Sequence, residues 1–284
     1  MFPWHDPRGA ISPLKTAAFA ALFLPAAAVA ILWATDGLGA RPLDAAIDLV
    51  GQWTIRLLFV TLAITPLAAL LKWPRVILLR RMAGVATFCY AILHLLLFAA
   101  DKGWLPGVVA GEIVLRVYLT IGFAGLLVFA ALAATSTDAA MRRLGARRWR
   151  RLHALVYPAA VLAVVHHFLQ AKLAAGEPLV MAGLLAWLLA FRALARGYGS
   201  AGRIPPRVAA LSLVLAAPLT ALGEAVWYAP SVGADPLLLL AANLSAEAGT
   251  RPAWVVAAFV VPLAVATLLR ARRPAAARLR PAAA

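Results

Sequence analysis

The sequence predicts an all-α membrane protein, a bundle of about eight transmembrane helices. Of its 284 residues, 64% are hydrophobic and 13% are charged, and the mean hydropathy is +0.88. Soluble domains do not have this composition. Eight apolar runs can each cross a hydrocarbon core of about 30 Å, which takes roughly 20 helical residues. Basic residues gather in every second loop between these runs.

The eight predicted spans follow one another with short connections. They cover approximately residues 16–34, 53–71, 82–100, 114–134, 152–171, 179–195, 208–228 and 253–269. Prolines lie inside four of them, at Pro66, Pro158, Pro218 and Pro262. A helix bundle tolerates such prolines because neighbouring helices satisfy the freed carbonyls. The single cysteine, Cys89, lies in the third span, so an intramolecular disulfide is excluded.

The net charge of +16 is distributed unevenly along the chain. Of the 27 Lys and Arg residues, 21 lie before the first span, in the second, fourth and sixth loops, or in the tail. They include Arg8 near the N-terminus and Arg273, Arg278 and Arg280 in the tail. The positive-inside rule therefore predicts a multi-pass protein with both termini in the cytoplasm. Membrane lipid accounts for the basic charge, and no nucleic-acid partner is needed.

Four of the five histidines lie within predicted spans, where an ionisable residue is costly and is a functional candidate. His94 lies about 20 Å along the third span from its cytoplasmic end. His166 and His167 reach a similar depth in the fifth span, whereas His153 lies near the cytoplasmic end of that span. The sequence thus predicts an outer pair of imidazoles on two helices and a single inner imidazole.

Two neutral imidazoles that face each other across a helix bundle are suitable axial ligands for a b-type haem. Covalent c-type attachment is excluded because the chain lacks a Cys-x-x-Cys-His motif. The alternative is that these histidines form interhelical hydrogen bonds or face a polar cavity. The equal depth of two histidines, in a chain with few others, favours haem.

The choice between His166 and His167 is open from geometry. On an ideal helix His153 and His166 point about 140° apart, whereas His153 and His167 differ by about 40°. A straight helix therefore favours His167 if both levels share one interior. Pro158 lies between these positions, however, and a proline kink changes the local twist.

Arginines near either membrane surface are candidates for binding haem propionates, because guanidinium pairs with carboxylate in a bidentate manner. Arg56 and Arg116 lie at the outer ends of the second and fourth spans, and Arg81 lies on the inner side. The alternative for each is that the side chain extends to the lipid headgroups. Glu224, near the outer end of the seventh span, is expected to be hydrated.

The sequence contains no Rossmann-type Gly-x-Gly-x-x-Gly unit, no phosphate-binding loop and no soluble domain large enough for a nicotinamide site. Electrons must therefore come from elsewhere. These absences indicate an electron-transfer subunit of an oxidoreductase complex more than a self-contained enzyme.

Four stretches of the chain resemble one family of membrane proteins. They are "DGLGARPLDAAIDLVGQWTIRLLFVTLAITPLA" (36–68), "RRMAGVATFCYAILHLLLF" (80–98), "RVYLTIGFAGLLVFAALAATST" (116–137) and "RRWRRLHALVYPAAVLAVVHHFLQAK" (147–172). In this order they resemble the MsrQ (YedZ) family, the haem-binding membrane subunits of the bacterial protein-methionine-sulfoxide reductase system, within the ferric reductase-like transmembrane superfamily. The resemblance covers roughly residues 14–196.

The resemblance implies two domains. Residues 1–196 would form the ferric reductase-like, haem-binding core of six helices. Residues 197–284 would be an extension with two spans and a basic cytoplasmic tail, and they contain no histidine.

The resemblance also implies a function, cofactors and partners. The protein would be an inner-membrane b-type cytochrome that takes electrons from quinol or from a cytoplasmic flavin reductase. It would pass them to a periplasmic molybdopterin-containing methionine sulfoxide reductase that repairs oxidised proteins. The family's haem histidines fall on His94, His153 and His166, and His166 rather than His167 occupies the family position. One haem b is implied, a second is open because His153 has no imidazole opposite it, and FMN is a further family cofactor.

Two other functions compete with this prediction. The first keeps the haem but changes the acceptor, which gives a membrane component of a ferric or other metal reductase. The second is a transporter or structural helix bundle without haem. No inverted repeat or pair of Gly/Pro-broken helices favours the transporter.

Overall fold

The computed structural model describes residues 4–5 and 9–272. Within this part every regular element is a helix, and the only β pairing is an isolated bridge between His5 and Ile11. Four basic residues of the predicted cytoplasmic side, Arg8, Arg273, Arg278 and Arg280, lie outside the described residues.

Eight helical segments of the described chain are long and apolar enough to cross a membrane, which confirms the predicted fold class. The first four contain α1 (Pro13–Ala21) with α2 (Leu24–Ala34), α3 (Pro42–Leu70), the 3₁₀ turn η1 (Pro74–Leu79) with α4 (Arg80–Asp101), and α6 (Val117–Ala134). The last four contain α7 (Asp138–His153) with α8 (Val156–Ala171), α9 (Gly176–Gly197), α10 (Pro206–Val214) with α11 (Ala216–Val232), and α13 (Pro252–Arg272). The shorter elements are α5 (Pro106–Leu115), η2 (Ala201–Arg203), α12 (Pro236–Ala242) and η3 (Ala246–Ala248).

Three of the spans are interrupted just before a proline, and α7 is also kinked at Gly145, where the backbone is non-helical (φ 72°, ψ 153°). The helices α1, α7 and α10 end at or next to the residue four positions before Pro25, Pro158 and Pro218. A proline ring clashes with that carbonyl and supplies no N–H to it, so the helix stops there and a new one starts. Pro66 and Pro262 instead lie within the uninterrupted helices α3 and α13.

Packing divides the chain into two compact units. The first comprises the described parts of residues 1–65 and 75–178, and the second comprises those of residues 66–74 and 179–284. The predicted division into residues 1–196 and 197–284 rests on family resemblance and stays a prediction.

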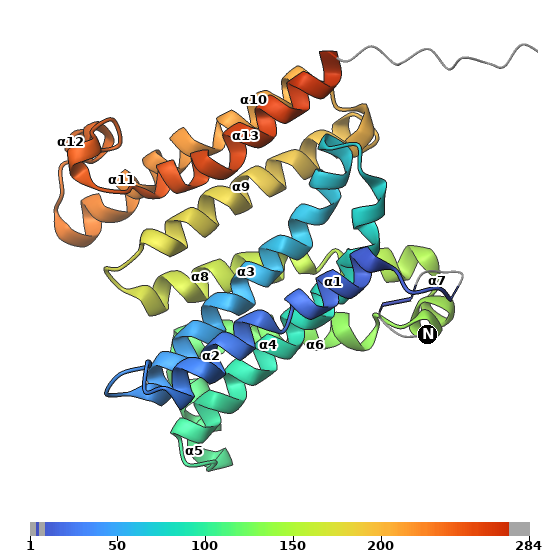
Figure 1. The fold of residues 1–284 in the computed structure, drawn as a ribbon. Helices are drawn as coiled ribbons and strands as arrows, with labels where there is room; N and C mark the ends of the chain where they lie inside the picture. The colour runs from blue at the N-terminus through green and yellow to red at the C-terminus, as the bar shows by residue number, and fades with distance from the viewer. Residues whose placement is uncertain (1–3, 6–8, 273–284) are drawn as a thin grey trace, which may run out of the picture. The chain divides into compact units, whose positions relative to one another are not determined.

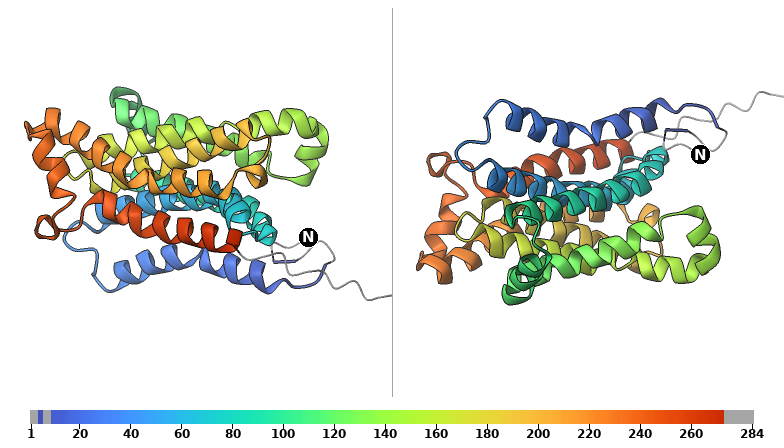
Figure 2. Two further views of the ribbon diagram at one scale, coloured as in Figure 1. Left: turned by 90° about the horizontal axis from the view of Figure 1, so that it is seen from above. Right: turned by 90° about the horizontal axis from the view of Figure 1, so that it is seen from below.

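In the first unit α6 packs along α8, and α4 also contacts α6 (Figure 1). The helix α5, which lies largely in the connection between the third and fourth predicted spans, packs against α4 and α6 (Figure 2). A core cluster of Val50, Leu57 and Tyr90 joins α3 to α4, and α1 and α2 pack against it through Leu22 and Val29. These contacts fix the helices that carry the candidate site.

Tyr90 explains how the break in the first span is accommodated. Its hydroxyl donates to the carbonyl of Leu22 at 2.7 Å and accepts from the N–H of Ala26 at 3.0 Å. In an unbroken helix these two backbone groups would bond to each other, because they are four residues apart. The Tyr90 hydroxyl is therefore inserted into the gap in the hydrogen-bond ladder.

In the second unit α10 and α11 lie along α13, and α12 packs on α11 (Figure 1). The helices α9 and α11 approach closely at Gly183, where a Cβ would collide with the hydroxyl of Thr220. The buried residues of this unit include Phe191, Leu213 and Val256. Small residues at the crossing and large apolar ones around it are typical of membrane helix packing.

Glu224 differs from the expectation that it is hydrated. Glu224 is only 2% exposed, and its carboxylate pairs with Arg251 at 3.0 Å. The side-chain amide of Asn243 also donates to it at 2.9 Å, and the indole N–H of Trp254 donates to the Asn243 carbonyl at 2.7 Å. This network ties the loop 229–251 to α11 and α13.

Candidate functional site

A cavity of about 480 Å³ lies in the first unit between α3, α4, α6 and α8. Its walls are mainly apolar and include Leu58 and Phe129, and three imidazoles, those of His94, His166 and His167, also line it. Cofactor sites are typically apolar cavities of this size with a few polar groups. The cavity brings together the three histidines that the sequence placed at the outer level.

The rings of His94 on α4 and His166 on α8 face each other in this cavity. Their centroids are 6.4 Å apart and their planes are inclined by 82°. The Nδ1 atom of His94 lies 2.9 Å from the carbonyl oxygen of Ile47, and that of His166 lies 2.7 Å from the carbonyl oxygen of Tyr118. A carbonyl can only accept, so both Nδ1 atoms carry the proton and both Nε2 atoms keep a free lone pair.

This geometry suits a metal ion bound between the two Nε2 atoms. Two metal–nitrogen bonds of about 2 Å, with each ring centroid about 1 Å behind its nitrogen, give a centroid separation of roughly 6 Å. In the part of the chain that the structure describes, no group of three or more His, Cys, Asp or Glu side chains could hold a metal ion. Two axial protein ligands without equatorial ones are the donor set of a haem, whose porphyrin supplies four nitrogens itself.

His167 lines the same cavity, but the ring that pairs with His94 is that of His166. The Nδ1 atom of His167 is buried and has no hydrogen-bond partner. The straight-helix argument for His167 does not apply, because the helix ends at His153 and a new one starts at Val156.

Arg56 lies on α3 near the polar edge of the cavity. Its guanidinium donates to the carboxylate of Glu177 at 2.8 Å and to the side-chain oxygen of Gln52 at 3.2 Å. Both partners line the cavity. The guanidinium is thus positioned beside the site.

Arg116 precedes α6, and its side chain is 51% exposed. It pairs with Glu112 at 2.7 Å and donates to the hydroxyl of Tyr118 at 3.3 Å. The hydrogen bond with Tyr118, followed by the nearby charge of Glu112, raises the pKa of Arg116. The Tyr118 ring stacks on that of His166, with centroids 6.3 Å apart. The sequence did not single out Tyr118. Its backbone carbonyl and its ring both contact His166, but no recognisable sequence motif marks such a residue.

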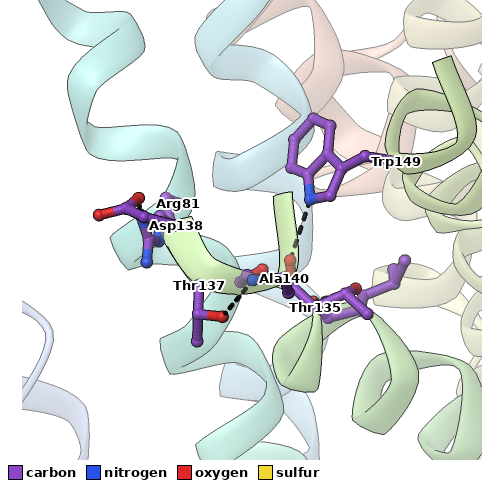
Figure 3. A network of polar contacts seen from close by, with 8 residues as sticks. Arg81, Thr135, Thr137, Asp138, Ala140 and Trp149 are labelled. Atoms are coloured by element: carbon purple, nitrogen blue, oxygen red, sulfur yellow. Dashed lines mark hydrogen bonds and ion pairs between the residues drawn. The ribbon is translucent and has the colours of Figure 1, made fainter. Parts of the chain in front are cut away.

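His153 and Arg81 are not among the residues that line the cavity. The His153 ring stacks on Trp149 with centroids 3.9 Å apart, and its Nε2 lies 3.1 Å from the hydroxyl of Thr135. Trp149 in turn donates to the Thr135 carbonyl at 2.9 Å (Figure 3). Arg81 pairs with Asp138 at 2.5 Å in an exposed position (Figure 3). The structure therefore contains a paired-histidine site and a separate single-histidine cluster.

Fold and site together define a multi-pass helical membrane protein with two imidazoles opposed across an apolar cavity. A family model described as ferric reductase like transmembrane component matches residues 50–164. The chain belongs to the family of protein-methionine-sulfoxide reductase heme-binding subunits, MsrQ.

The relatives with that name include proteins from three different bacteria. The one from Rhodospirillum rubrum is 42% identical over 63% of this chain and 86% of its own length. Those from Azospira oryzae and Ralstonia nicotianae are 38% and 36% identical, over 75% and 73% of this chain and 94% and 100% of their own lengths. No solved structure matches the chain.

Proposed function

We propose that this chain is a haem-binding electron-transfer subunit of a methionine sulfoxide reductase system, with His94 and His166 as axial ligands of a b-type haem. The observation that carries the proposal is the opposed imidazole pair, with centroids 6.4 Å apart and both Nδ1 atoms bonded to carbonyls. The names of the relatives, which specify heme binding, support it.

The residues around the pair have separable roles. The carbonyls of Ile47 and Tyr118 fix the ring orientations and raise the basicity of the Nε2 atoms. The apolar walls exclude water. Arg56 and Arg116 are the groups we assign to the haem propionates. When bound, haem iron supplies one-electron chemistry by alternating between its ferric and ferrous states.

The direction of electron flow follows from the predicted topology. Both termini and the basic loops would lie in the cytoplasm, so the His94–His166 pair would lie in the outer half of the inner membrane. Electrons would enter from quinol or a cytoplasmic flavin reductase and leave to a periplasmic molybdopterin-containing reductase. His153, with Arg81 near the inner surface, is our candidate for a second haem. FMN is the further cofactor that the family suggests, and we assign no side chains to it.

Absorption spectra of the purified protein test the haem proposal. After reconstitution with haem, we expect a Soret band that shifts on reduction with dithionite. His94→Ala and His166→Ala should each remove the spectrum of the outer haem, because each deletes an axial nitrogen. His167→Ala is the matched control and should leave that spectrum nearly intact. Loss of the spectrum in His167→Ala but not in His166→Ala would contradict the ligand assignment.

The match to a ferric reductase component favours one second candidate, a membrane component of a metal reductase. The two functions differ in the acceptor. Reoxidation of the reduced protein by an oxidised molybdopterin-containing methionine sulfoxide reductase supports the first. Reoxidation by chelated ferric iron alone would favour the second.

A further inference from the structure

Two glycines lie directly against the rings of the paired histidines. A Cβ added to Gly51 of α3 would lie 2.9 Å from Cε1 of His94. A Cβ added to Gly122 of α6 would lie 2.8 Å from Nδ1 of His166. Both distances are shorter than real Cβ atoms show, so any larger residue would displace the ring.

Each glycine lies four residues after the carbonyl that holds the same ring. Ile47 precedes Gly51, and Tyr118 precedes Gly122, by one helical turn. In an α-helix residue i+4 lies next to the carbonyl of residue i along the axis, because its N–H bonds to that carbonyl. An imidazole can therefore reach the carbonyl of residue i only if residue i+4 has no side chain in its path.

The same arrangement occurs twice. The carbonyl and the histidine are 47 residues apart in the first case and 48 in the second. In each case one helix supplies the carbonyl and the glycine, and a later helix supplies the histidine. The two axial positions are thus built by matched units of the chain, Ile47/Gly51/His94 and Tyr118/Gly122/His166.

Two other glycines of the first unit show that the close approach is specific. A Cβ at Gly125 of α6, which also lines the cavity, would be 3.9 Å from its nearest neighbour, Leu162. A Cβ at Gly84 of α4 would be 3.5 Å from Thr61. Both distances are ordinary van der Waals contacts, so alanine fits at these two positions.

We propose that Gly51 and Gly122 are positioning residues, each of which allows one histidine to bond a helix carbonyl through Nδ1 and so leaves its Nε2 available to a haem iron. The proposal rests on the proposed ligation of haem by His94 and His166. Gly51→Ala would turn the ring of His94, and Gly122→Ala that of His166. Either change breaks the Nδ1 bond or misaligns the Nε2 lone pair.

The first test is haem titration of the full-length protein in detergent, followed by absorption. Gly51→Ala and Gly122→Ala should each weaken haem affinity by about 10- to 100-fold, the loss typical when the outer partner of a ligating histidine is removed. The remaining bound haem should lose its six-coordinate, low-spin spectrum. Gly84→Ala, at a glycine that does not line the cavity, should bind haem as the unaltered protein does.

The second test needs no haem and isolates the contact with the ring. Thermal unfolding of the haem-free protein is measured for each glycine variant with and without His94→Ala or His166→Ala, as a double-mutant cycle. Gly51→Ala should lower the melting temperature when it is the only substitution. In the His94→Ala background it should not, because the ring that the added methyl group would strike is then absent. Gly122→Ala should be rescued in the same way by His166→Ala only, so the crossed pairs are the controls.

The outcomes separate the two proposals. Unchanged haem affinity and spin state in both glycine variants, with haem bound by the unaltered protein, would overturn the positioning role and leave the proposed function standing. Equal destabilisation in the matched and crossed backgrounds would also overturn it. An unaltered protein that binds no haem would overturn both.

Discussion

At the scale of single residues, the most informative quantity is the angle of 82° between the planes of His94 and His166. If the two histidines hold a haem iron between them, as proposed, the π orbital of each imidazole would interact with a different dπ orbital of the iron. These two iron orbitals stay close in energy when the planes are perpendicular and separate when the planes are parallel. The orientation of the two rings should therefore be visible in the magnetic properties of the oxidised protein.

We expect the ferric protein to give a highly anisotropic low-spin signal with one large g value, because the planes are nearly perpendicular. Electron paramagnetic resonance at low temperature measures it, and His167→Ala should leave the signal unchanged. A rhombic signal with three well-separated lines would mean that the rings are nearly parallel when haem is bound.

Depth along the spans predicted which histidines meet, but three features of the site were not predictable from the sequence. The contact of the His94 ring with His166, and not with His167, could not be read from the position of Pro158. Ile47 and Tyr118 act through their carbonyls, which every residue has. Gly51 and Gly122 act through the absence of a side chain. Only the neighbours in the folded chain distinguish these residues from others of the same type.

At the scale of helices, the breaks before Pro25, Pro158 and Pro218 leave backbone groups without their usual partners. In a membrane no water replaces them, so side chains must. Tyr90 does this for the first span by bonding both Leu22 and Ala26. These hydrogen bonds predict that removal of the Tyr90 hydroxyl alone destabilises the protein.

Tyr90→Phe should lower stability by about 1–3 kcal/mol, because a half-buried carbonyl and a half-buried N–H both lose their partner while the ring volume is kept. Thermal unfolding in detergent measures the change. Tyr198→Phe is the control, since Tyr198 is 40% exposed. Equal melting temperatures for Tyr90→Phe and the unaltered protein would show that other groups satisfy the break.

At the scale of the whole molecule, hydropathy alone was sufficient to predict the eight spans, because a stretch of about 20 apolar residues has few alternatives to crossing a membrane. It did not predict the helix α5 in a connecting segment or the burial of Glu224. Both depend on contacts with distant residues: α5 packs on α4 and α6, and Glu224 pairs with Arg251 and Asn243.

The distribution of basic residues predicts that both ends of the chain face the cytoplasm. A reporter that is active only in the periplasm should be inactive when fused after the last span, and active when inserted in the loop 229–251. A reporter that fluoresces only in the cytoplasm should give the opposite pattern. Periplasmic activity of the fusion after the last span would contradict the predicted orientation.

The kink at Gly145 also has a consequence for how the chain can vary. In a continuous helix, each residue inserted on the Arg-rich side of His166 would rotate this histidine by about 100° and abolish its alignment. Because the backbone is non-helical at Gly145, a change of length before this residue need not be carried into the helical stretch that leads to His166. We therefore expect residues 138–144 to tolerate insertions or deletions without any compensating change around the histidine pair.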